Sequence, residues 1–350
     1  MATPEYPSRR YYACGTKRHT VWGTAVAITG PLDGILMKGD SGLALNQKYE
    51  PYPAVDQIMP MNGALGILEP SEFTPPVDLQ YEMGAWGRWL AALFGTAGVP
   101  ATLGGGAGRK HTFQWADSVT HFFTYAEERT GKIWEVASAM PYKLNLKLSG
   151  AQIAAAITLR GNTLIDDSVT NTDTQMTAIT YADRGNFVNF IHGSFLMNAQ
   201  AAATLSNPTD KVDISDFELN LERSIDSVHV AGLTNIAEPK EGEFPKNNFK
   251  ITLPRASAAN AAYFTTFKAL TPLKGLLSFV GALCATPYYY TVSFYFPQLR
   301  LVSAPDIKLD GIMKNEMVFE IEQAGAAVNG MLYVRPYAEI TNLQTTDYLA

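Results

Sequence analysis

The chain is poor in charged residues, and acidic residues slightly outnumber basic ones. Only 17% of its 350 residues are Asp, Glu, Lys or Arg, below the roughly 25% of an ordinary soluble domain. So uncharged a surface indicates extensive contacts between chains. The formal net charge is -6 and the sequence has no long basic run, which argues against a surface built to grip nucleic-acid phosphates.

Cysteines and histidines are also scarce. Cys14 and Cys284 lack CxxC spacing, which argues against a disulfide framework and a zinc site. The five histidines show neither HxxxH nor HExxH spacing. We therefore expect no metal ion, no cofactor and no catalytic residue.

Long apolar runs are missing as well. The most apolar stretch, residues 269–285, contains Pro272 and Lys274 and is shorter than the about 20 residues that a membrane-crossing helix needs. The N-terminal residues lack the apolar core of a secretory signal. We expect synthesis in a reducing cytoplasm and no membrane partner.

What the chain does contain is a long series of predicted strands. Aromatic and β-branched residues gather in segments that glycine and proline separate. Two helices are predicted, Glu82 to Thr96 and Ala256 to Phe279, with a break or kink at Pro272. The expected fold class is mainly β, of the α+β type. The predicted strands are 73–80, 111–128, 132–137, 142–150, 153–161, 216–225, 247–254, 288–302, 306–312 and 315–323.

The order of these elements repeats. Each half has a strand, then a helix, then a long strand and a closing pair of strands. We predict a duplication into two tandem units, 1–170 and 171–350, with the boundary inside residues 165–179, where polar residues interrupt the apolar pattern. Two unrelated antiparallel units that share a common plan are the alternative.

Two of the predicted strands alternate between apolar and polar residues. In 216–225 the apolar positions are Phe217, Leu219 and Leu221. Such a period of two is typical of a strand with one dry face and one wet face. Residues 142–150 show a comparable alternation. The polar positions of the two strands are Glu218, Asn220, Glu222, Lys143, Asn145 and Lys147.

Two short motifs resemble catalytic or binding loops. GDSG, residues 39–42, matches the surroundings of a nucleophilic serine, but only His19 precedes Ser41 as a possible base. GGGAGRK, residues 104–110, resembles a phosphate-binding loop, yet Arg109 stands where a glycine is required. We interpret the first as a turn and the second as a flexible loop.

A ligand- or carbohydrate-binding β-sandwich is a competing hypothesis. It would use tryptophans as platforms for sugar rings, and the chain has five. Trp86 and Trp89 stand at helical spacing, which favours a place in the core. An enzyme built around GDSG is a third and more remote hypothesis.

Several stretches together resemble a known family. They are KRHTVWGTAVAIT, PYKLNLKLSGAQIAAAITLRGN, VDISDFELNLERSI, FPKNNFKITLP and YYYTVSFYFPQLRLVSAPDIKLDGIMKNEMVFEIEQAG. With them the chain resembles the major tail tube proteins of long-tailed, siphovirus-type bacteriophages, in a fused two-domain form. The resemblance extends over nearly the whole chain and rests on patterns of medium specificity.

The resemblance implies two tandem β-sandwich domains, each with a flanking α-helix. Such chains stack as rings into a hollow tube through which DNA leaves the capsid. A fused chain would form a trimeric ring with pseudo-six-fold symmetry. The loops 38–61, 98–110 and 235–248 are the candidates for contacts between rings. The implied location is the virion tail, after synthesis in the host cytoplasm.

The resemblance also implies partners and a surface. The partners are further copies of the chain, a tape measure protein, and tail terminator and tip proteins, while DNA passes without specific binding. The six polar residues named above would line the lumen, although the outer surface of a sheet is an equal alternative. Negative charge there would keep DNA from sticking, but Lys143 and Lys147 argue against a uniformly negative wall.

Overall fold

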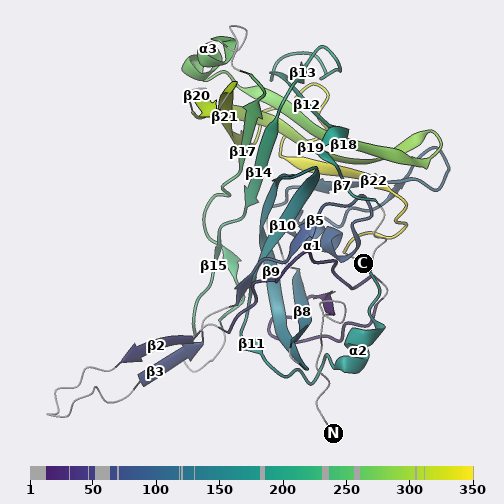
Figure 1. The fold of residues 1–350 in the computed structure, drawn as a ribbon, viewed down its shortest axis with the longest axis vertical. Coiled ribbons are helices and arrows are strands. Elements are labelled where there is room, and N and C mark those ends of the chain that lie inside the picture. The colour runs from purple at the N-terminus through teal and green to yellow at the C-terminus, as the bar shows by residue number, and fades with distance from the viewer. Residues whose placement is uncertain are drawn as a thin grey trace, which may run out of the picture.

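The computed structural model shows a mainly β protein, which confirms the predicted fold class (Figure 1). It describes residues 13–30, 32–45, 47–51, 64–68, 71–117, 119, 121–129, 131–181, 186–230, 236–255, 261–303, 306–310 and 312–349. Of the loops predicted to join rings, residues 46, 52–61 and 235 lie outside this description.

The first half contains eleven described strands and one long helix, α1. The helix is Gly84–Phe94. The strands are β1 Cys14–His19, β2 Gln47–Pro51, β3 Ala64–Leu68, β4 Glu72–Phe73, β5 Pro76–Asp78, β6 Ala101–Thr102, β7 Arg109–Gln114, β8 Phe122–Arg129, β9 Lys132–Ser149, β10 Gln152–Gly161 and β11 Leu164–Ile165. The ribbon of β2 and β3 projects from the body of the molecule at the lower left of Figure 1.

The second half begins with short helices and continues with strands. Its helical elements are α2 Asp173–Ala178, the 3-10 helix η2 Phe190–His192, and α3 Ala261–Ala269. Its described strands are β12 Gly193–Ala199, β13 Lys211–Val212, β14 Asp216–Glu222, β15 Ile225–Asp226, β16 Lys240–Glu241, β17 Asn248–Leu253, β18 Leu273–Ala285, β19 Tyr288–Leu301, β20 Asp306–Asp310, β21 Ile312–Glu322 and β22 Tyr337–Asn342.

One antiparallel sheet runs through both halves. Its strands pair in the order β5, β10, β9, β14, β17, β21 and β20, and β4 pairs with β10 beyond β5. We call these strands the shared sheet, because β9 of the first half pairs directly with β14 of the second. The pairing joins the halves through backbone hydrogen bonds as well as side chains.

A second layer also draws on both halves. Strands β12, β18, β19, β22 and β7 pair in this order, with β13 beside β12 and β6 beside β7. The pairing of β22 with β7 is a second connection between the halves. The last residues of β19 also pair with β21 and so link this layer to the shared sheet.

The strand pairings of the first half recur in the second. The pairs β1–β8, β8–β9, β9–β10, β10–β5 and β9–β11 have the counterparts β12–β18, β18–β19, β19–β21, β21–β17 and β19–β22, all antiparallel. Helix α1 follows β5, and α3 follows its counterpart β17. A duplicated unit would produce such a common pairing scheme. The duplication and its boundary after residue 170 stay predictions.

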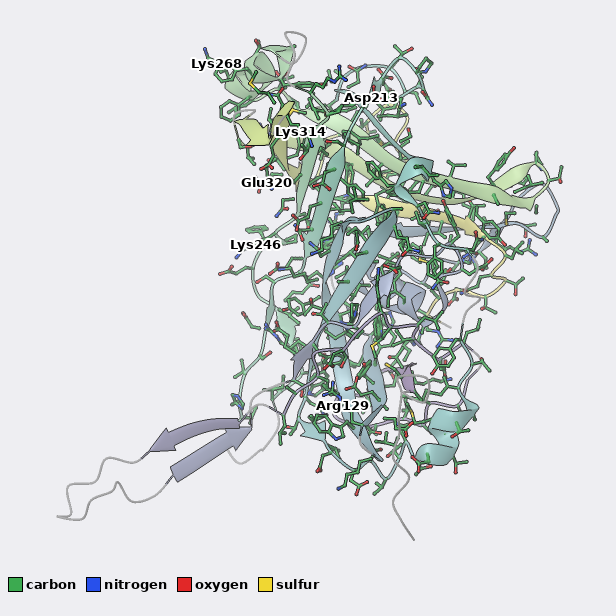
Figure 2. The ribbon with its side chains drawn as sticks, in the orientation of Figure 1. Arg129, Asp213, Lys246, Lys268, Lys314 and Glu320 are labelled. Carbon is green, nitrogen blue, oxygen red and sulfur yellow. The ribbon has the colours of Figure 1, made fainter. Side chains whose placement is uncertain are left out.

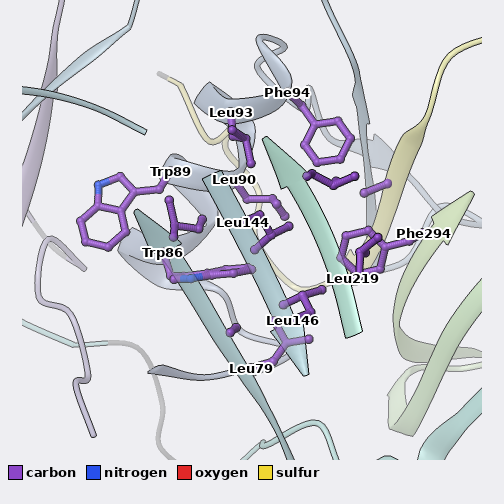
Figure 3. Packing of buried hydrophobic residues seen from close by; sticks show 14 of the residues in the cluster. Leu79, Trp86, Trp89, Leu90, Leu93, Phe94, Leu144, Leu146, Leu219 and Phe294 are labelled. Atoms are coloured by element: carbon purple, nitrogen blue, oxygen red, sulfur yellow. The ribbon is translucent and has the colours of Figure 1, made fainter. Parts of the chain in front are cut away.

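Helix α1 lies against the dry face of the shared sheet (Figure 3). Its apolar side chains, among them Trp89, Leu90 and Leu93, are buried in one cluster with Leu144 of β9 and Leu219 of β14. Gly95 ends the helix with φ 82 and donates its N–H to the Ala91 carbonyl, a conformation that glycine adopts without strain. The core is therefore common to both halves.

Several predicted elements are wrong in extent: the strands predicted over 132–137 and 142–150 are the single strand β9, and the strand predicted over 73–80 is divided into β4 and β5. The helix predicted over 256–279 ends at Ala269, where Leu270 takes a φ of 50, and residues 273–285 form strand β18. The apolar run after Pro272 suited either structure, and pairing with β12 and β19 decided it. The long strand predicted over 111–128 is interrupted after Gln114, because the chain turns so that Ala116 N–H donates to the Phe94 carbonyl.

Candidate functional site

The six polar residues predicted from the alternation come together on one face of the shared sheet. Strand β14 pairs with β9 so that Glu218 lies opposite Lys147, Asn220 opposite Asn145, and Glu222 opposite Lys143. All six are at least partly exposed to solvent. The sequence placed them on two separate strands, and the structure makes one surface of them, which we call the polar face.

Complementary contacts connect the two strands across the polar face. The Lys143 ammonium lies 3.0 Å from the Glu222 carboxylate. The Asn145 amide donates to the Glu218 carboxylate at 2.8 Å and to the Asn220 carbonyl at 2.6 Å. The two strands read KLNLK and ELNLE, so they match position by position with opposite charge. This match is the sequence signal that could have identified the pair.

The polar face continues over the neighbouring strands of the second half. Lys250 of β17 lies opposite Glu218 in register and binds Glu316 of β21 at 3.0 Å. Arg300 of β19 holds Glu322 of β21 through its Nε at 2.9 Å, and this guanidinium lowers the pKa of the Glu322 carboxyl. Glu320 of the same strand also points outward near the upper left edge in Figure 2.

It continues over the first half too. Strand β10 places small residues, Ala154 and Ala156, beside the polar positions of β9. Beside β10, Arg160 binds Glu72 at 3.0 Å. Lys38 binds Asp78 of the neighbouring strand β5 at 3.0 Å. Exposed ion pairs of this kind contribute at most about 1 kcal/mol each. Their consequence is a surface in which cations and carboxylates alternate.

The apolar positions of the same strands are buried. Phe217, Leu219 and Leu221 all lie in the core, as the alternation predicts. Leu144 and Leu146 of β9 lie beside them, beneath helix α1 (Figure 3). A one-residue shift of either strand would exchange the dry and wet faces, so the core fixes which side chains the polar face presents.

Arg223, which directly follows β14, fastens the two halves and was not predicted. Its buried guanidinium donates to the carbonyls of Leu93 and Phe94 at the C-terminal end of α1, at 2.6 and 3.1 Å. It also binds Glu241 at 2.6 Å and lies 4.3 Å from the centre of the Trp115 ring. A cation at this end complements the helix dipole and satisfies carbonyls that the helix leaves free.

Burial lowers the pKa of Arg223, and the nearby Glu241 carboxylate opposes that shift. A signal for this residue exists in the sequence. Arg223 is the next alternate residue after Phe217, Leu219 and Leu221. If the strand continued, its side chain would therefore point to the dry face. A charged residue there requires buried partners.

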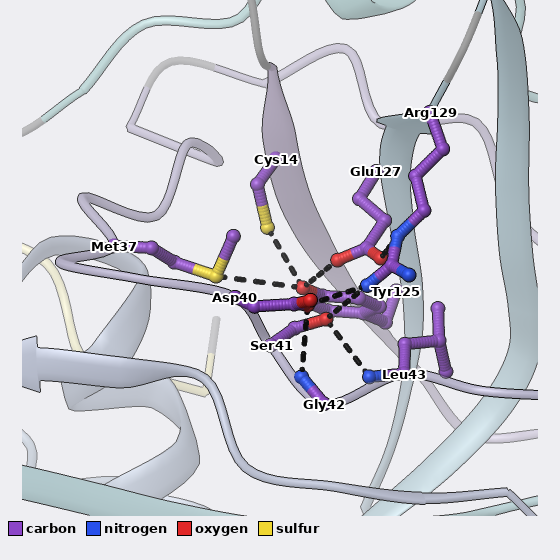
Figure 4. Close-up of polar contacts among 9 residues, drawn as sticks. All are labelled: Cys14, Met37, Asp40, Ser41, Gly42, Leu43, Tyr125, Glu127 and Arg129. Carbon is purple, nitrogen blue, oxygen red and sulfur yellow. Dashed lines mark hydrogen bonds and ion pairs between the residues drawn. The ribbon is translucent and has the colours of Figure 1, made fainter. Parts of the chain in front are cut away.

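The GDSG segment forms a turn that Arg129 fastens (Figure 4). Gly42 N–H donates to the Asp40 carboxylate at 3.1 Å, and Leu43 N–H donates to the Ser41 hydroxyl at 3.1 Å. Arg129 donates to Asp40 at 2.6 Å and to Ser41 at 3.3 Å. The buried Ser41 hydroxyl is thus held by a turn amide and a guanidinium, with no histidine bonded to it among the described residues.

Behind this turn lies a buried chain of polar groups. The Tyr125 hydroxyl donates to the Glu127 carboxylate at 2.7 Å and accepts from the Cys14 thiol at 3.1 Å. Burial raises the pKa of Tyr125 and of Cys14, so both stay protonated at neutral pH. Arg129 completes the chain through Glu127 at 2.5 Å. The arrangement leaves no activated nucleophile at this turn.

The glycine-rich segment is occupied by contacts within the chain. Arg109 donates to the Gly106 and Gly108 carbonyls at 2.7 and 3.0 Å, and Lys110 binds Glu339 at 2.6 Å. Both cations are therefore engaged away from any phosphate. Within the described ranges no three His, Cys, Asp or Glu side chains form a cluster that could hold a metal ion.

Three of the five tryptophans lie in the core. Trp86, Trp89 and Trp115 are buried. Trp22 packs edge-on against Phe122 and donates its indole N–H to the Ile236 carbonyl at 3.1 Å, and Arg129 stacks on Trp134 at 4.8 Å. Trp22 and Trp134 are therefore the two tryptophans that stay partly exposed, and each has a contact within the chain.

Comparisons with known proteins add no functional assignment. No helix in the described part of the chain is long and apolar enough to cross a membrane. No protein-family model matches the sequence, and no curated protein matches it either.

Proposed function

We propose that the chain is a structural protein of a phage tail that assembles with copies of itself into stacked rings and so forms the tail tube. The observation that carries this proposal is the polar face, which crosses from the first half to the second on one continuous sheet. A sheet with one buried face and one extended, wet, ion-paired face suits the wall of a water-filled channel. The family resemblance of the sequence points the same way.

The polar face also suits the passage of DNA. Nonspecific binding to DNA arises when lysine and arginine side chains replace the counterions of phosphates. Here the cations Lys143, Lys250 and Arg300 are each paired with a carboxylate. A phosphate would have to compete with those carboxylates, so a polyanion gains little by adhering. A wall of this kind conducts DNA without holding it.

The repeated pairing scheme supports the proposed stoichiometry. If each half is one copy of a unit, three chains supply six units around an axis. Such rings need heterologous contacts, in which one surface meets a different surface on the neighbour. Contacts of that kind also explain a chain with only 17% charged residues. The tape measure protein and the terminator and tip proteins are the further partners of this proposal.

Negative-stain electron microscopy of the purified chain tests the proposal, with sedimentation velocity over a range of concentrations alongside it. We expect rings or tubes with a central stain-filled channel and a sedimentation coefficient that rises with concentration. A chain that remains monomeric at all concentrations, with no rings, would contradict the proposal.

A further inference from the structure

The shared sheet ends in two backbone edges that have no partner strand among the described residues. One edge is residues 36–41, an irregular segment that bends at Lys38 and Gly39 and leads into the GDSG turn; we call it the 36–41 edge. The backbone N–H of Lys38 donates to the Pro76 carbonyl at 2.8 Å, and the backbone carbonyl of Ser41 accepts from the Thr74 N–H at 2.9 Å. These two bonds hold the segment beside β4 and β5. The other edge is β20, whose strand pairing is with β21. Unpaired edges of this kind are templates for a further strand.

The joint between β9 and β14 shows how such edges meet. Strand β9 flanks β10 on one side and meets β14 on the other, and β14 flanks β17. In the repeated scheme the counterpart of β10 is β21, which β20 flanks. The counterpart of β17 is β5, which the 36–41 edge flanks. The two open edges therefore correspond to the two sides of the joint that the chain already contains.

We propose that the 36–41 edge of one copy pairs antiparallel with strand β20 of a second copy, repeating the β9–β14 joint between chains. The inference rests on the proposed self-assembly and names the surfaces that carry it. The occupant is a second copy of this chain, because the two edges correspond to a joint that this same chain forms internally. The contact is heterologous, so it leaves one open edge on each copy for the next one.

The two edges of a single chain cannot meet each other. Strands β5, β10, β9, β14, β17 and β21 lie between them. At about 4.8 Å per strand spacing, the seven spacings separate the edges by roughly 34 Å along the sheet. Any direct link between them must therefore join two copies.

The residue types of the two edges are complementary. The 36–41 edge carries Lys38 and Asp40, which bind Asp78 and Arg129 within the chain and would exchange or share these partners. Strand β20 carries Asp306, Lys308 and Asp310. An antiparallel register with Asp40 opposite Lys308 also sets Lys38 opposite Asp310. The internal joint shows the same opposition of charge, with Glu218 opposite Lys147 and Glu222 opposite Lys143. Opposite charges across paired strands are favourable, and like charges are not.

Disulfide trapping tests this pairing. The variant Asp40→Cys/Lys308→Cys, in a Cys284→Ser background, is oxidised after assembly and separated on a non-reducing gel. Because a disulfide requires α-carbons about 4.4–6.8 Å apart, we expect the yield of covalent dimers and trimers to be at least tenfold above that of either single-cysteine variant. The matched control is Asp40→Cys/Asp213→Cys, since the Asp213 side chain is 78% exposed and lies outside both edges.

The outcomes separate this inference from the proposed function. Rings or tubes in which the double variant cross-links no more than its control would overturn the edge pairing and leave the tube intact. Absence of rings from the wild-type chain would instead contradict the proposed function. Should the cysteine variant fail to assemble, a charge exchange decides. We expect Asp40→Lys to reduce assembly several-fold and Asp40→Lys/Lys308→Asp to restore it, and unimpaired assembly of Asp40→Lys would overturn the pairing.

Discussion

Helices α1 and α3 take corresponding places in the two halves, but their surroundings differ. Every residue of α1 except Arg88 is buried. In α3 the described side chains are all at least partly exposed, and Phe264 keeps 49% of its surface in solvent. The difference follows from what the other half supplies, because Arg223 binds the C-terminal end of α1 and Tyr348 packs against its Gly87.

Helices at corresponding places in the two halves can therefore differ in how deeply their side chains are buried. Helix α1 lies at the joint between the halves. There β14 pairs with β9, β22 pairs with β7, and the C-terminal residues Tyr348 and Leu349 are buried in one cluster with α1. Helix α3 lies near the open β20 end, at the top of Figure 1. The first half is thus covered at α1 by residues of the second half, whereas α3 has no comparable cover among the described residues.

The largest expected effect is the difference in stability between a variant in α1 and a matched variant in α3. Trp89→Ala in α1 removes a fully buried ring from the common core and should lower the free energy of unfolding by about 3–5 kcal/mol. Phe264→Ala in α3 is the matched variant, and we expect a loss below about 1 kcal/mol because half of that ring is already in water. Urea unfolding of the unassembled chain measures both. Equal losses would break the comparison.

The next effect concerns the arginines near the two helix ends. Arg223→Met leaves the carbonyls of Leu93 and Phe94 without their buried donor, at an expected cost of about 1–3 kcal/mol. The matched variant is Arg300→Met, because Arg300 donates to the Leu270 carbonyl just past α3 from a side chain that is 32% exposed. It should cost less than about 1 kcal/mol. A reversed order in thermal or urea unfolding would contradict the proposed role of Arg223.

A smaller effect is the pH dependence of the joint between β7 and β22. Burial lowers the pKa of His111 from 6.5, and the Gly98 and Gln344 carbonyls only partly offset this. The unfolded chain therefore takes up a proton first as the pH falls below 6.5, and stability declines by less than about 1.4 kcal/mol per pH unit. His111→Gln should flatten the curve of unfolding free energy against pH between 7 and 5. An unchanged slope would exclude His111 as its source.

The smallest expected effect is on the polar face. Lys143→Glu places like charge beside Glu222, which now binds Lys143 at 3.0 Å. Because the pair is solvent-exposed, we expect a loss below about 1 kcal/mol. The exchange Lys143→Glu/Glu222→Lys should restore stability. Failure of the exchange to restore it would show that the two side chains do not act as a pair.

Local patterns in the sequence predicted the strands and their wet and dry faces. The alternation of Phe217, Leu219 and Leu221 is a property of adjacent residues, and the structure confirms it. The pairing of β9 with β14 depends on residues more than 70 positions apart, which no local period reveals. The prediction of a helix after Pro272 is wrong because the state of this apolar run depends on its pairing with β12 and β19, which local sequence does not reveal. Arg223 was missed for the same reason, since its partners come from α1 and Glu241.

An averaged end-on electron-microscopy view of assembled particles tests the central claim most directly. The account predicts a ring of three chains with six similar lobes around an open channel, and the polar face of the shared sheet directed toward that channel. A closed, isolated molecule, or a ring in which the polar face is turned outward, would contradict it.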